Sequence, residues 1–431
     1  MSNKFWNEKV ETISTEELEK LQLLKLNKII NYTHRYSPFY QVKFGKNKIQ
    51  KLKKLSDIQS LPLTSKSEII NANMDDLIAT DKKRVVEVHL SSATTNKPSP
   101  SFWTDTDLKK SSTYLARTWY MQGVRQETTF GMLASYGMFS AGLLNHYAIQ
   151  EIGAFVVPVS HSPAEKTLNY LDMFQVDSVA SVASYYLYMI NKLSSGSHVK
   201  TNLNLKNIIA GGEPFTENQR HYIEKSLNVK MYDQYGLCEI NTGLAGECAY
   251  QNGLHILADY AYPEIINPET LQACEPGESG ELVLTTLERE ASPLIRYRTG
   301  DITSINYETC KCGRTMPRLS RFKERVHDTI FYKGSKIQTN DIKAFLEELG
   351  GYVDPYFWTL QIQGSMSDQN MLLKLINRND MRLASFSTYI AAKLLKRFGI
   401  RIEVDILSAE EIDNMGSGKL KYIQDLRREI S

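Results

Sequence analysis

The sequence predicts an α/β protein: a large N-terminal domain with mostly parallel sheets flanked by helices, followed by a small C-terminal α+β domain. Between residues 85 and 226, short strand-like segments alternate with segments of helical periodicity, as in the β-α-β units of a parallel sheet. After Lys333 a different order of helices and strands follows. A chain of 431 residues is also too long for one ordinary core, so more than one domain is expected.

The N-terminal region is expected to begin with a helix. Ser14 and Glu17 form a capping box, and leucines follow near helical spacing. This helix should end near His34, because the Ser37-Pro38 pair forces an extended turn. Residues 61–66 then form a loop that opens another helix.

The alternating region is expected to supply the main sheet. We predict strands at residues 85–90, 129–135, 154–159, 178–182 and 207–210. We predict helices from about residue 105 and at residues 140–152, 164–173, 184–193 and 216–226. Ligands of parallel sheets bind at the carboxyl ends of the strands, so motifs that follow these strands can meet in one cleft.

The C-terminal region is expected to be a compact α+β unit. Helices are predicted at residues 339–349 and 381–398, and strands at residues 358–363, 371–377 and 402–407. Polar residues separate apolar segments near Arg325. We therefore predict an N-terminal domain of residues 1–325 and a mobile C-terminal domain of residues 326–431.

The composition excludes several classes of protein. Lysine and arginine number 51 against 49 acidic residues, a net charge of +2, which argues against a nucleic-acid-binding protein. No apolar run reaches the ~18 residues that would span a membrane, and the N-terminus lacks the apolar core of a signal peptide. Five cysteines at irregular spacing do not indicate a disulfide framework, so a cytoplasmic protein is expected. A homodimer is compatible with the sequence.

Two polar motifs have the chemistry to hold a nucleotide. Asp301 follows the apolar residues 282–284 and 294–295 and is expected at a strand end, where a carboxylate can accept two hydrogen bonds from a ribose. The alternative is an ordinary turn aspartate. Residues 91–98 offer hydroxyls and Lys97, and such a loop can wrap a triphosphate with its backbone N–H groups. It is not a Walker A loop, and a β–α turn without a ligand is the alternative.

Cys248, His255, Cys310 and Cys312 form a candidate tetrahedral zinc set. Cys310 and Cys312 lie among polar residues, which argues against a role as apolar core. The spacing is not that of a standard zinc finger, so free thiols are the alternative. Four protein ligands would make the zinc structural, because no coordination position stays open for catalysis.

The order of the motifs resembles that of the adenylate-forming superfamily, and within it the phenylacetate–CoA ligase family. The motifs that carry this resemblance are residues 90–98 (LSSATTNKP), 211–214 (GGEP), 232–239 (YDQYGLCE), 296–301 (RYRTGD) and 418–419 (GK). The resemblance covers nearly the whole chain, from Trp6 to Lys419.

The resemblance implies a role for each motif. It assigns ATP binding to Ser91, Ser92, Thr94, Thr95, Lys97, Gly212, Glu213, Pro214, Tyr235 and Asp301. It assigns the acyl-substrate pocket to Tyr136, Phe139, Ser140, Ala210, Gly211, Gly236 and His161. It assigns catalysis to Lys419, Glu239 and Arg325, with Glu239 also binding Mg²⁺.

The chain departs from the family pattern in three places. Ala93 and Asn96 replace glycines of the phosphate loop; asparagine tolerates a positive φ, but alanine would cost ~1–2 kcal/mol there. His327 stands where the family usually has a hinge aspartate. Residues 161–163 (HSP) replace a Gly-Gly-Asn-like loop, which suggests a different acid and a more polar pocket.

The resemblance implies a two-step reaction. A carboxylic acid, aryl or short acyl, attacks the α-phosphate of ATP and gives acyl-AMP, and coenzyme A then displaces AMP. ATP, Mg²⁺ and coenzyme A are thereby implied, and Zn²⁺ would be structural. No covalent enzyme intermediate is needed, so catalysis consists of positioning and charge stabilisation. The alternatives are transfer to an amine or a carrier-protein thiol, and a catalytically degenerate nucleotide-binding relative.

Overall fold

The computed structural model describes residues 4–45, 49–91, 98–160, 162–194, 202–322, 324–325, 329–332, 335–364, 369–378, 383–407, 411 and 422–426. The chain forms two compact units. The first comprises Met1–Ser181, His198–Gly212 and Glu224–Phe322, and the second comprises Val182–Ser197, Glu213–Ile223 and Lys323–Ser431. The second unit thus takes two segments from the alternating region, and the predicted division at residue 325 stays a prediction.

Short helices and 3₁₀ turns form the N-terminal region. They are α1 (Glu8–Glu11), α2 (Thr15–Tyr36), α3 (Pro38–Phe44), η1 (Leu55–Ser60), α4 (Lys66–Asn71), η2 (Met74–Leu77) and η3 (Lys82–Arg84). The capping box of Ser14 and Glu17 begins α2 as predicted. The expected extended turn is shorter than predicted: only Ser37 is extended, and it caps α3. Pro38 begins α3 because its fixed φ suits the first helical position.

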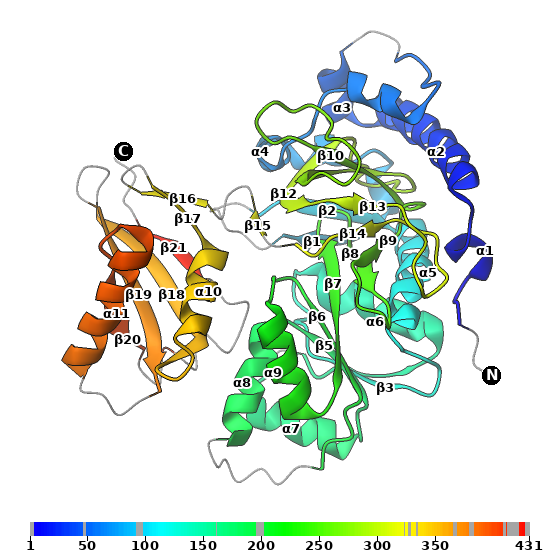
Figure 1. The fold of residues 1–431 in the computed structure, drawn as a ribbon. Coiled ribbons are helices and arrows are strands. Elements are labelled where there is room, and N and C mark those ends of the chain that lie inside the picture. Colours follow the sequence, from blue (N-terminus) through cyan, green and yellow to red (C-terminus); the bar gives the residue numbers. More distant parts are fainter. Residues whose placement is uncertain are drawn as a thin grey trace. The chain divides into compact units, whose positions relative to one another are not determined.

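A nine-stranded sheet forms the centre of the first unit (Figure 1). Its order is β13 (Ile305–Asn306), β14 (Arg318–Leu319), β9 (Leu254–Ile256), β8 (Asn241–Glu247), β7 (Lys230–Leu237), β6 (Asn207–Gly211), β5 (Ser178–Ser181), β3 (Thr129–Met132) and β4 (Phe155–Val157). The strands from β7 to β4 pair parallel; β6, β5, β3 and β4 lie where strands were predicted, whereas β7 was not predicted. Those from β7 to β13 pair antiparallel.

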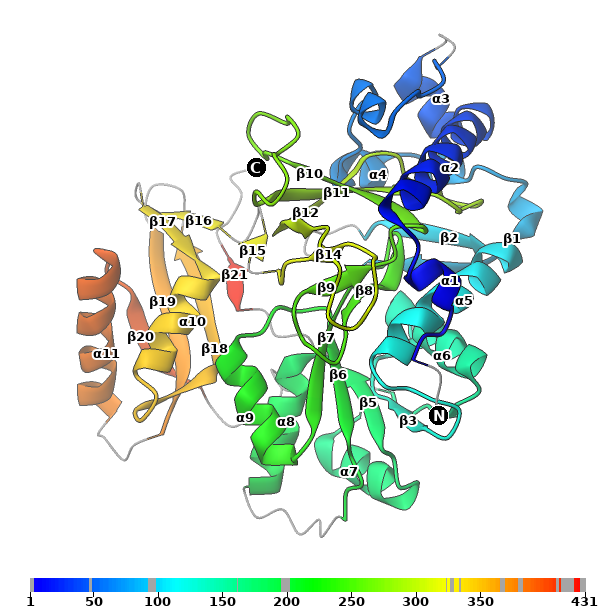
Figure 2. The ribbon, with the colours of Figure 1, turned by 45° about the vertical axis from the view of Figure 1, so that its right-hand side comes forward.

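Three of the helices in this unit precede or connect its parallel strands. They are α5 (Asp105–Met121), α6 (Ser140–Ile152) and α7 (Ala164–Met173), and all three begin where predicted. Figure 2 shows α5 and α6 side by side, and both contact β8. Trp119 on α5 and Phe130 on β3 are fully buried and meet edge to face, so these helices share a core with the sheet.

Two smaller sheets complete the first unit. β1 (Val85–Leu90) and β2 (Pro100–Thr104) pair antiparallel, and β2 was not predicted. β10 (Ala261–Ile266), β11 (Gly280–Thr286) and β12 (Tyr297–Thr303) form an antiparallel sheet. Asp301 lies inside β12, so its predicted place at a strand end was wrong. The strand starts only at Tyr297 because Arg296 has a φ of 47°, which interrupts the extended backbone before it.

The second unit contains a mixed four-stranded sheet. Its order is β20 (Glu403–Ile406), β19 (Gln369–Asn377), β18 (Val353–Gly364) and β21 (Ile423–Asp425). The other elements of its C-terminal part are β15 (Glu324–Arg325), β16 (Thr329–Tyr332), β17 (Ser335–Gln338), α10 (Thr339–Glu348) and α11 (Leu383–Phe398). The predicted α+β pattern is therefore found, with β16, β17 and β21 as additions. α8 (Ala183–Ser194) and the first part of α9 (Glu217–Leu227) belong to this unit.

None of the helices in the described part of the chain combines the length and the apolar character needed to cross a bilayer.

Candidate functional site

Ser91 and Ser99 close the neck of the predicted phosphate loop. The Ser91 N–H donates to the Ser99 carbonyl at 3.0 Å, and the Ser99 N–H donates to Ser91 Oγ at 3.0 Å. The two hydroxyls lie 2.6 Å apart. Four of the predicted ATP-binding residues follow Ser91 and lie outside the described residues: Ser92, Thr94, Thr95 and Lys97. The described part therefore places the ends of this loop but not its phosphate contacts.

Glu239 lies beside that neck, in the turn between β7 and β8. Its side chain is 5% exposed, which excludes an ordinary solvated carboxylate. Ser99 Oγ donates to Glu239 Oε1 at 2.5 Å, and the Lys66 ammonium lies 3.3 Å from the same oxygen. A buried carboxylate next to a phosphate loop supplies the hard oxygen ligand that Mg²⁺ requires, so the predicted Mg²⁺ role fits this residue.

Tyr235 and Asp301 meet inside the first unit. The Tyr235 hydroxyl donates to Asp301 Oδ2 at 2.7 Å, and Asp301 is 3% exposed. The Tyr235 ring stacks on Phe322, with centroids 3.9 Å apart and planes 18° apart. The fold thus brings the predicted ribose carboxylate and the predicted adenine-binding tyrosine together, although β7 and β12 belong to different sheets.

Backbone hydrogen bonds attach the segment before α4 to the start of β12. The Thr64 N–H donates to the Arg296 carbonyl, and the Arg298 N–H donates to the Thr64 carbonyl, both at 2.8 Å. Arg296 is buried and its guanidinium donates to both oxygens of Glu264, at 3.2 and 3.0 Å. A charged, bidentate pair of this kind holds a defined geometry. It supports the strand that carries Asp301.

The predicted acyl-substrate loop contacts α6 and β1. The Tyr136 hydroxyl and His146 Nδ1 are 2.9 Å apart, and the Leu90 N–H donates to the Met138 carbonyl at 2.9 Å. Burial raises the pKa of Tyr136 and lowers the pKa of His146, because both charged forms lose hydration. Tyr136 on this loop and His146 on α6 therefore form a hydrogen-bonded pair in which both side chains are neutral near neutral pH.

The other predicted acyl-substrate residues lie in different environments. Ser140 begins α6 and is buried, whereas Phe139 is 47% exposed. Ala210 and Gly211 end β6. A Cβ at Gly236 would lie 2.2 Å from the Thr242 carbonyl, so glycine is required for the approach of β7 and β8. His161 lies outside the described residues.

The predicted adenine loop at residues 212–214 carries a buried glutamate. Glu213 Oε1 accepts a hydrogen bond from the Ser184 N–H at 2.6 Å, at the start of α8. A carboxylate stabilises a helix N-terminus, which gives Glu213 a structural role in the second unit. Gly212 has a φ of 84°, a conformation that few other residues adopt. Pro214 accepts a hydrogen bond from Lys343 at 3.4 Å through its carbonyl.

The predicted zinc ligands converge in the first unit. Cys248 follows β8, His255 lies on β9, and Cys310 and Cys312 precede β14. Their ligand atoms all lie within 4.8 Å of one another, and all four residues are buried. The hydrogen bond between Cys248 and Cys312 lowers the pKa of Cys312 and raises that of Cys248, and one from His255 lowers the pKa of Cys310. Thiolates are the metal-binding form of cysteine, so this donor set fits Zn²⁺.

Two of the predicted catalytic residues are not placed by the structure. Arg325 lies on the short strand β15, and its side chain is outside the described part of the chain. Lys419 lies outside the described residues, as does His327 of the predicted hinge. Their roles stay predictions.

Sequence reasoning missed Lys66 and Ser99, the two residues that contact Glu239. The position of Ser99 directly after the Ser/Thr-rich loop could have indicated its role, but no motif near Lys66 in the sequence indicates a contact with Glu239.

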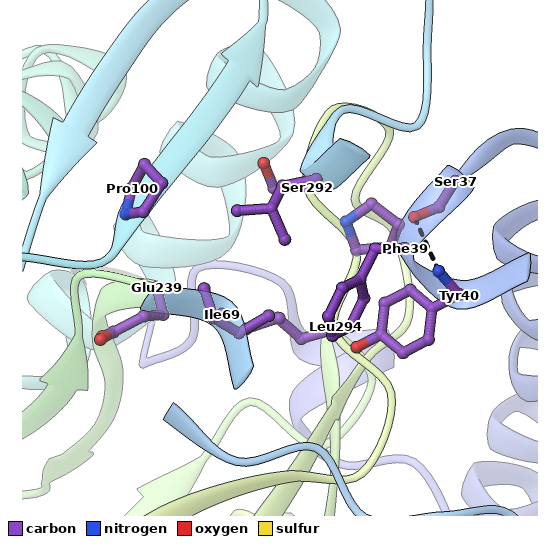
Figure 3. A pocket seen from close by; sticks show the side chains of 10 residues that line it. Ser37, Phe39, Tyr40, Ile69, Pro100, Glu239, Ser292 and Leu294 are labelled. Atoms are coloured by element: carbon purple, nitrogen blue, oxygen red, sulfur yellow. Dashed lines mark hydrogen bonds between the residues drawn. The ribbon is translucent and has the colours of Figure 1, made fainter. Parts of the chain in front are cut away.

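Glu239 also borders a small, mostly apolar pocket next to α3 and α4 (Figure 3). Its lining residues are Ser37, Phe39, Tyr40, Ile69, Leu77, Pro100, Ser292, Pro293 and Leu294. Figure 3 shows the Glu239 carboxylate directed away from Phe39 and Tyr40.

Comparisons with known proteins place the chain among acid–CoA ligases. No family model matches it. Phenylacetate–coenzyme A ligase of Escherichia coli is 33% identical over 97% of each chain. The ligase of the same name from Thermus thermophilus is 29% identical over 97% of this chain and 99% of that protein. The crystal structure of 2-hydroxyisobutyryl-CoA ligase with 2-HIB-AMP covers 98% of this chain and 93% of that chain, with a TM-score of 0.86 and 22% identity, which shows the fold.

Proposed function

The chain belongs to the phenylacetate–coenzyme A ligase family, and we propose that it activates a carboxylic acid with ATP and transfers the acyl group to coenzyme A. The observation that carries this proposal is the similarity to curated ligases of this family along almost the whole chain. The chain is thus an AMP-forming acid–thiol ligase, with acyl-AMP as the intermediate.

In the first half-reaction, a carboxylate oxygen of the acid attacks the α-phosphorus of ATP and pyrophosphate leaves. Asp301 accepts hydrogen bonds from the ribose hydroxyls, and Tyr235 contacts the adenine. The loop closed by Ser91 and Ser99 surrounds the phosphates. Mg²⁺, held by Glu239, would neutralise phosphate charge. Lys419 stabilises the charge that develops on the leaving pyrophosphate. Each of these residues positions or stabilises, and none reacts covalently.

In the second half-reaction, the thiol of coenzyme A attacks the acyl carbonyl and AMP leaves. The second step requires a different arrangement of the groups around the acyl-AMP, and a small C-terminal domain that moves between the two steps would provide it. We assign this motion to residues 326–431, with Arg325 next to the hinge. The altered hinge residue His327 is expected to shift the balance between the two arrangements, because an imidazole replaces a carboxylate at this position.

The acid is an aryl or short acyl acid with a polar contact. Tyr136 and His146 support this class, because they offer neutral hydrogen-bonding groups at the predicted pocket. Phe139 adds an exposed aromatic face on the same loop. A flat acid with a hydroxyl or carbonyl substituent would satisfy both kinds of contact.

The cysteine–histidine cluster holds one structural zinc ion. Its four ligands leave no coordination position for a substrate, so the ion would not take part in the reaction. The loops that carry Cys310 and Cys312 would instead be fixed by the metal.

Acid-dependent exchange of pyrophosphate into ATP tests the proposed function. The exchange should appear with phenylacetate or a related member of a panel of carboxylic acids, and product analysis should find the CoA thioester. An acceptor screen with amines and carrier proteins tests the alternative acceptors, and size-exclusion chromatography tests the homodimer. A chain that binds ATP but exchanges pyrophosphate with no acid would favour the degenerate nucleotide-binding alternative.

A further inference from the structure

Asn145 joins two elements that carry predicted acyl-substrate residues. It lies on α6, which begins at Ser140, just after the loop that carries Tyr136. Thr242 on β8 donates a hydrogen bond from Oγ1 to Asn145 Oδ1 at 3.0 Å. The carbonyl of the same threonine is the group that requires a glycine at Gly236. The hydrogen bond therefore connects α6 to β8 beside the predicted acyl-substrate residues of both.

The loop that carries Tyr136 packs closely on the first turn of α6. A Cβ at Gly142 would lie 2.3 Å from the Ser135 carbonyl, so only a glycine allows this approach. One turn further along the helix, His146 contacts the Tyr136 hydroxyl, and Asn145 is the residue before it. The loop, α6 and β8 thus meet around Asn145.

The protein uses only the oxygen of the Asn145 amide. Asn145 is 5% exposed, and its Oδ1 accepts the hydrogen bond from Thr242. The described part of the chain supplies no acceptor for its Nδ2, and this atom is not fully enclosed. An amide nitrogen carries two N–H donors, and a nearly buried donor without a protein partner is satisfied by water or by a ligand. Asn145 therefore offers a fixed donor to a molecule that enters from outside.

The hydrogen-bonding groups beside Asn145 are uncharged. Burial raises the pKa of Tyr136 and lowers the pKa of His146, and residues 135–152 contain no lysine or arginine. A second carboxylate on the substrate would lose hydration here without a cation from this loop or helix to pair with. A neutral oxygen, such as that of a hydroxyl, an ether or a carbonyl group, can accept the N–H without this cost. An apolar acid would displace the water and leave the N–H unpaired.

We propose that Asn145 is a specificity-determining residue, which donates a hydrogen bond from Nδ2 to a neutral oxygen substituent of the carboxylic acid. Thr242 holds the amide in the orientation that leaves this donor available. The inference rests on the proposed function as an acid-activating ligase and names the residue that selects the substituent of the acid. A site built to hydrogen-bond a substrate oxygen discriminates against the analogue that lacks it. The parent protein should therefore prefer a hydroxylated acid to the same acid without the hydroxyl group.

The test measures acid-dependent pyrophosphate exchange with pairs of acids that differ by one hydroxyl group: phenylacetate and its monohydroxylated derivatives, and butanoate and its hydroxy derivatives. Asn145→Leu keeps the approximate size of the side chain and removes the donor. It should lower the ratio of kcat/KM for the preferred hydroxy acid to that for its partner by ~10-fold or more, the scale of a hydrogen bond left unmade. Thr242→Val should lower this ratio less, because the amide stays but loses its fixed orientation. Gln150→Leu is the control: it removes an exposed amide from the same helix and should leave the ratio unchanged.

A merely structural role of Asn145 would affect all acids alike, so the ratio separates the two roles. An unchanged ratio in Asn145→Leu, or a parent that prefers the unsubstituted acid of every pair, would overturn the inference and leave the proposed function intact. If Asn145→Leu does not fold, the ratio in Thr242→Val decides by the same criterion. A parent that exchanges pyrophosphate with no acid contradicts the proposed function itself, and the inference then fails with it.

Discussion

Asp301 is oriented by the protein in the nucleotide-free chain. Its carboxylate is buried and accepts a hydrogen bond from the Tyr235 hydroxyl, so the side chain cannot rotate freely. A carboxylate held in this way binds a diol with little further loss of conformational freedom. The contact between Tyr235 and Asp301 would therefore orient the carboxylate for the proposed ribose binding.

Replacement of Asp301 by alanine should weaken ATP binding by ~10-fold or more, because two charge-assisted hydrogen bonds to the ribose are lost. Both half-reactions should slow, since AMP stays bound through each. Calorimetric titration with ATP and the rates of the two steps measure this. Tyr235→Phe is the matched variant: it keeps the ring but removes the bond to Asp301, and its effect should be smaller. Unchanged ATP affinity in Asp301→Ala would remove the assignment.

His146 should make the stability of the chain sensitive to acid. Burial lowers its folded-state pKa below the usual ~6.5, so the unfolded chain binds more protons at this residue between the two values. The free energy of unfolding therefore falls as the pH drops below ~6.5. His146→Gln should lose less stability between pH 7 and pH 5 than the parent, measured by urea unfolding. Identical pH dependence of the two proteins would contradict this.

At the scale of elements, the cysteine–histidine cluster joins parts of the first unit that are distant in sequence. The ligands come from the end of β8, from β9 and from the loop before β14. The same loop holds the N-terminus: Arg314 Nε donates to Glu11 Oε2 at 2.6 Å, and the Thr315 N–H donates to the Glu11 carbonyl at 3.0 Å. α1 is thus attached to the loop that carries two of the proposed zinc ligands.

Elemental analysis should find about one zinc per chain. Chelation, or Cys312→Ser, should lower the melting temperature and expose α1 to proteolysis, because the loop that anchors Glu11 loses its fixed shape. Cys274→Ser is the control, since this partly exposed cysteine lies outside the cluster. A fully folded, equally stable protein that contains no zinc when purified without chelators would count against the site.

At the scale of the whole molecule, the two half-reactions should depend on different parts of the chain. Lys419→Ala should slow acyl-AMP formation by ~10²-fold, the scale of a lost charge-stabilising contact. Its effect should be on kcat, because the contact forms as pyrophosphate leaves. Synthetic acyl-AMP should still give thioester at a near-normal rate. If Lys421→Ala shows this loss instead, the assignment is off by two residues.

Local patterns of residues were sufficient for most of the fold. Helical periodicity and caps identified α2, α6 and α7, because helical hydrogen bonds join residues close in sequence. The strand pattern identified β1, β3, β4, β5 and β6, because it reflects which side chains of one segment are buried. The grouping of Cys248, His255, Cys310 and Cys312 was also predicted from the sequence, and the zinc ion itself stays a prediction. α3 was missed because the Ser37-Pro38 pair was expected to force an extended turn, whereas Pro38 begins the helix. β2 was not predicted.

Tertiary structure decided the contacts within the site. No pattern around Lys66 indicates Glu239, and none around Tyr235 indicates Asp301, because each pair joins segments that are remote in sequence. The place of Asp301 inside β12 depends on the backbone of Arg296, which a buried pair with Glu264 supports. Periodicity encodes which face of an element is buried. It does not encode which distant element covers that face, since strand pairing and side-chain packing determine that choice.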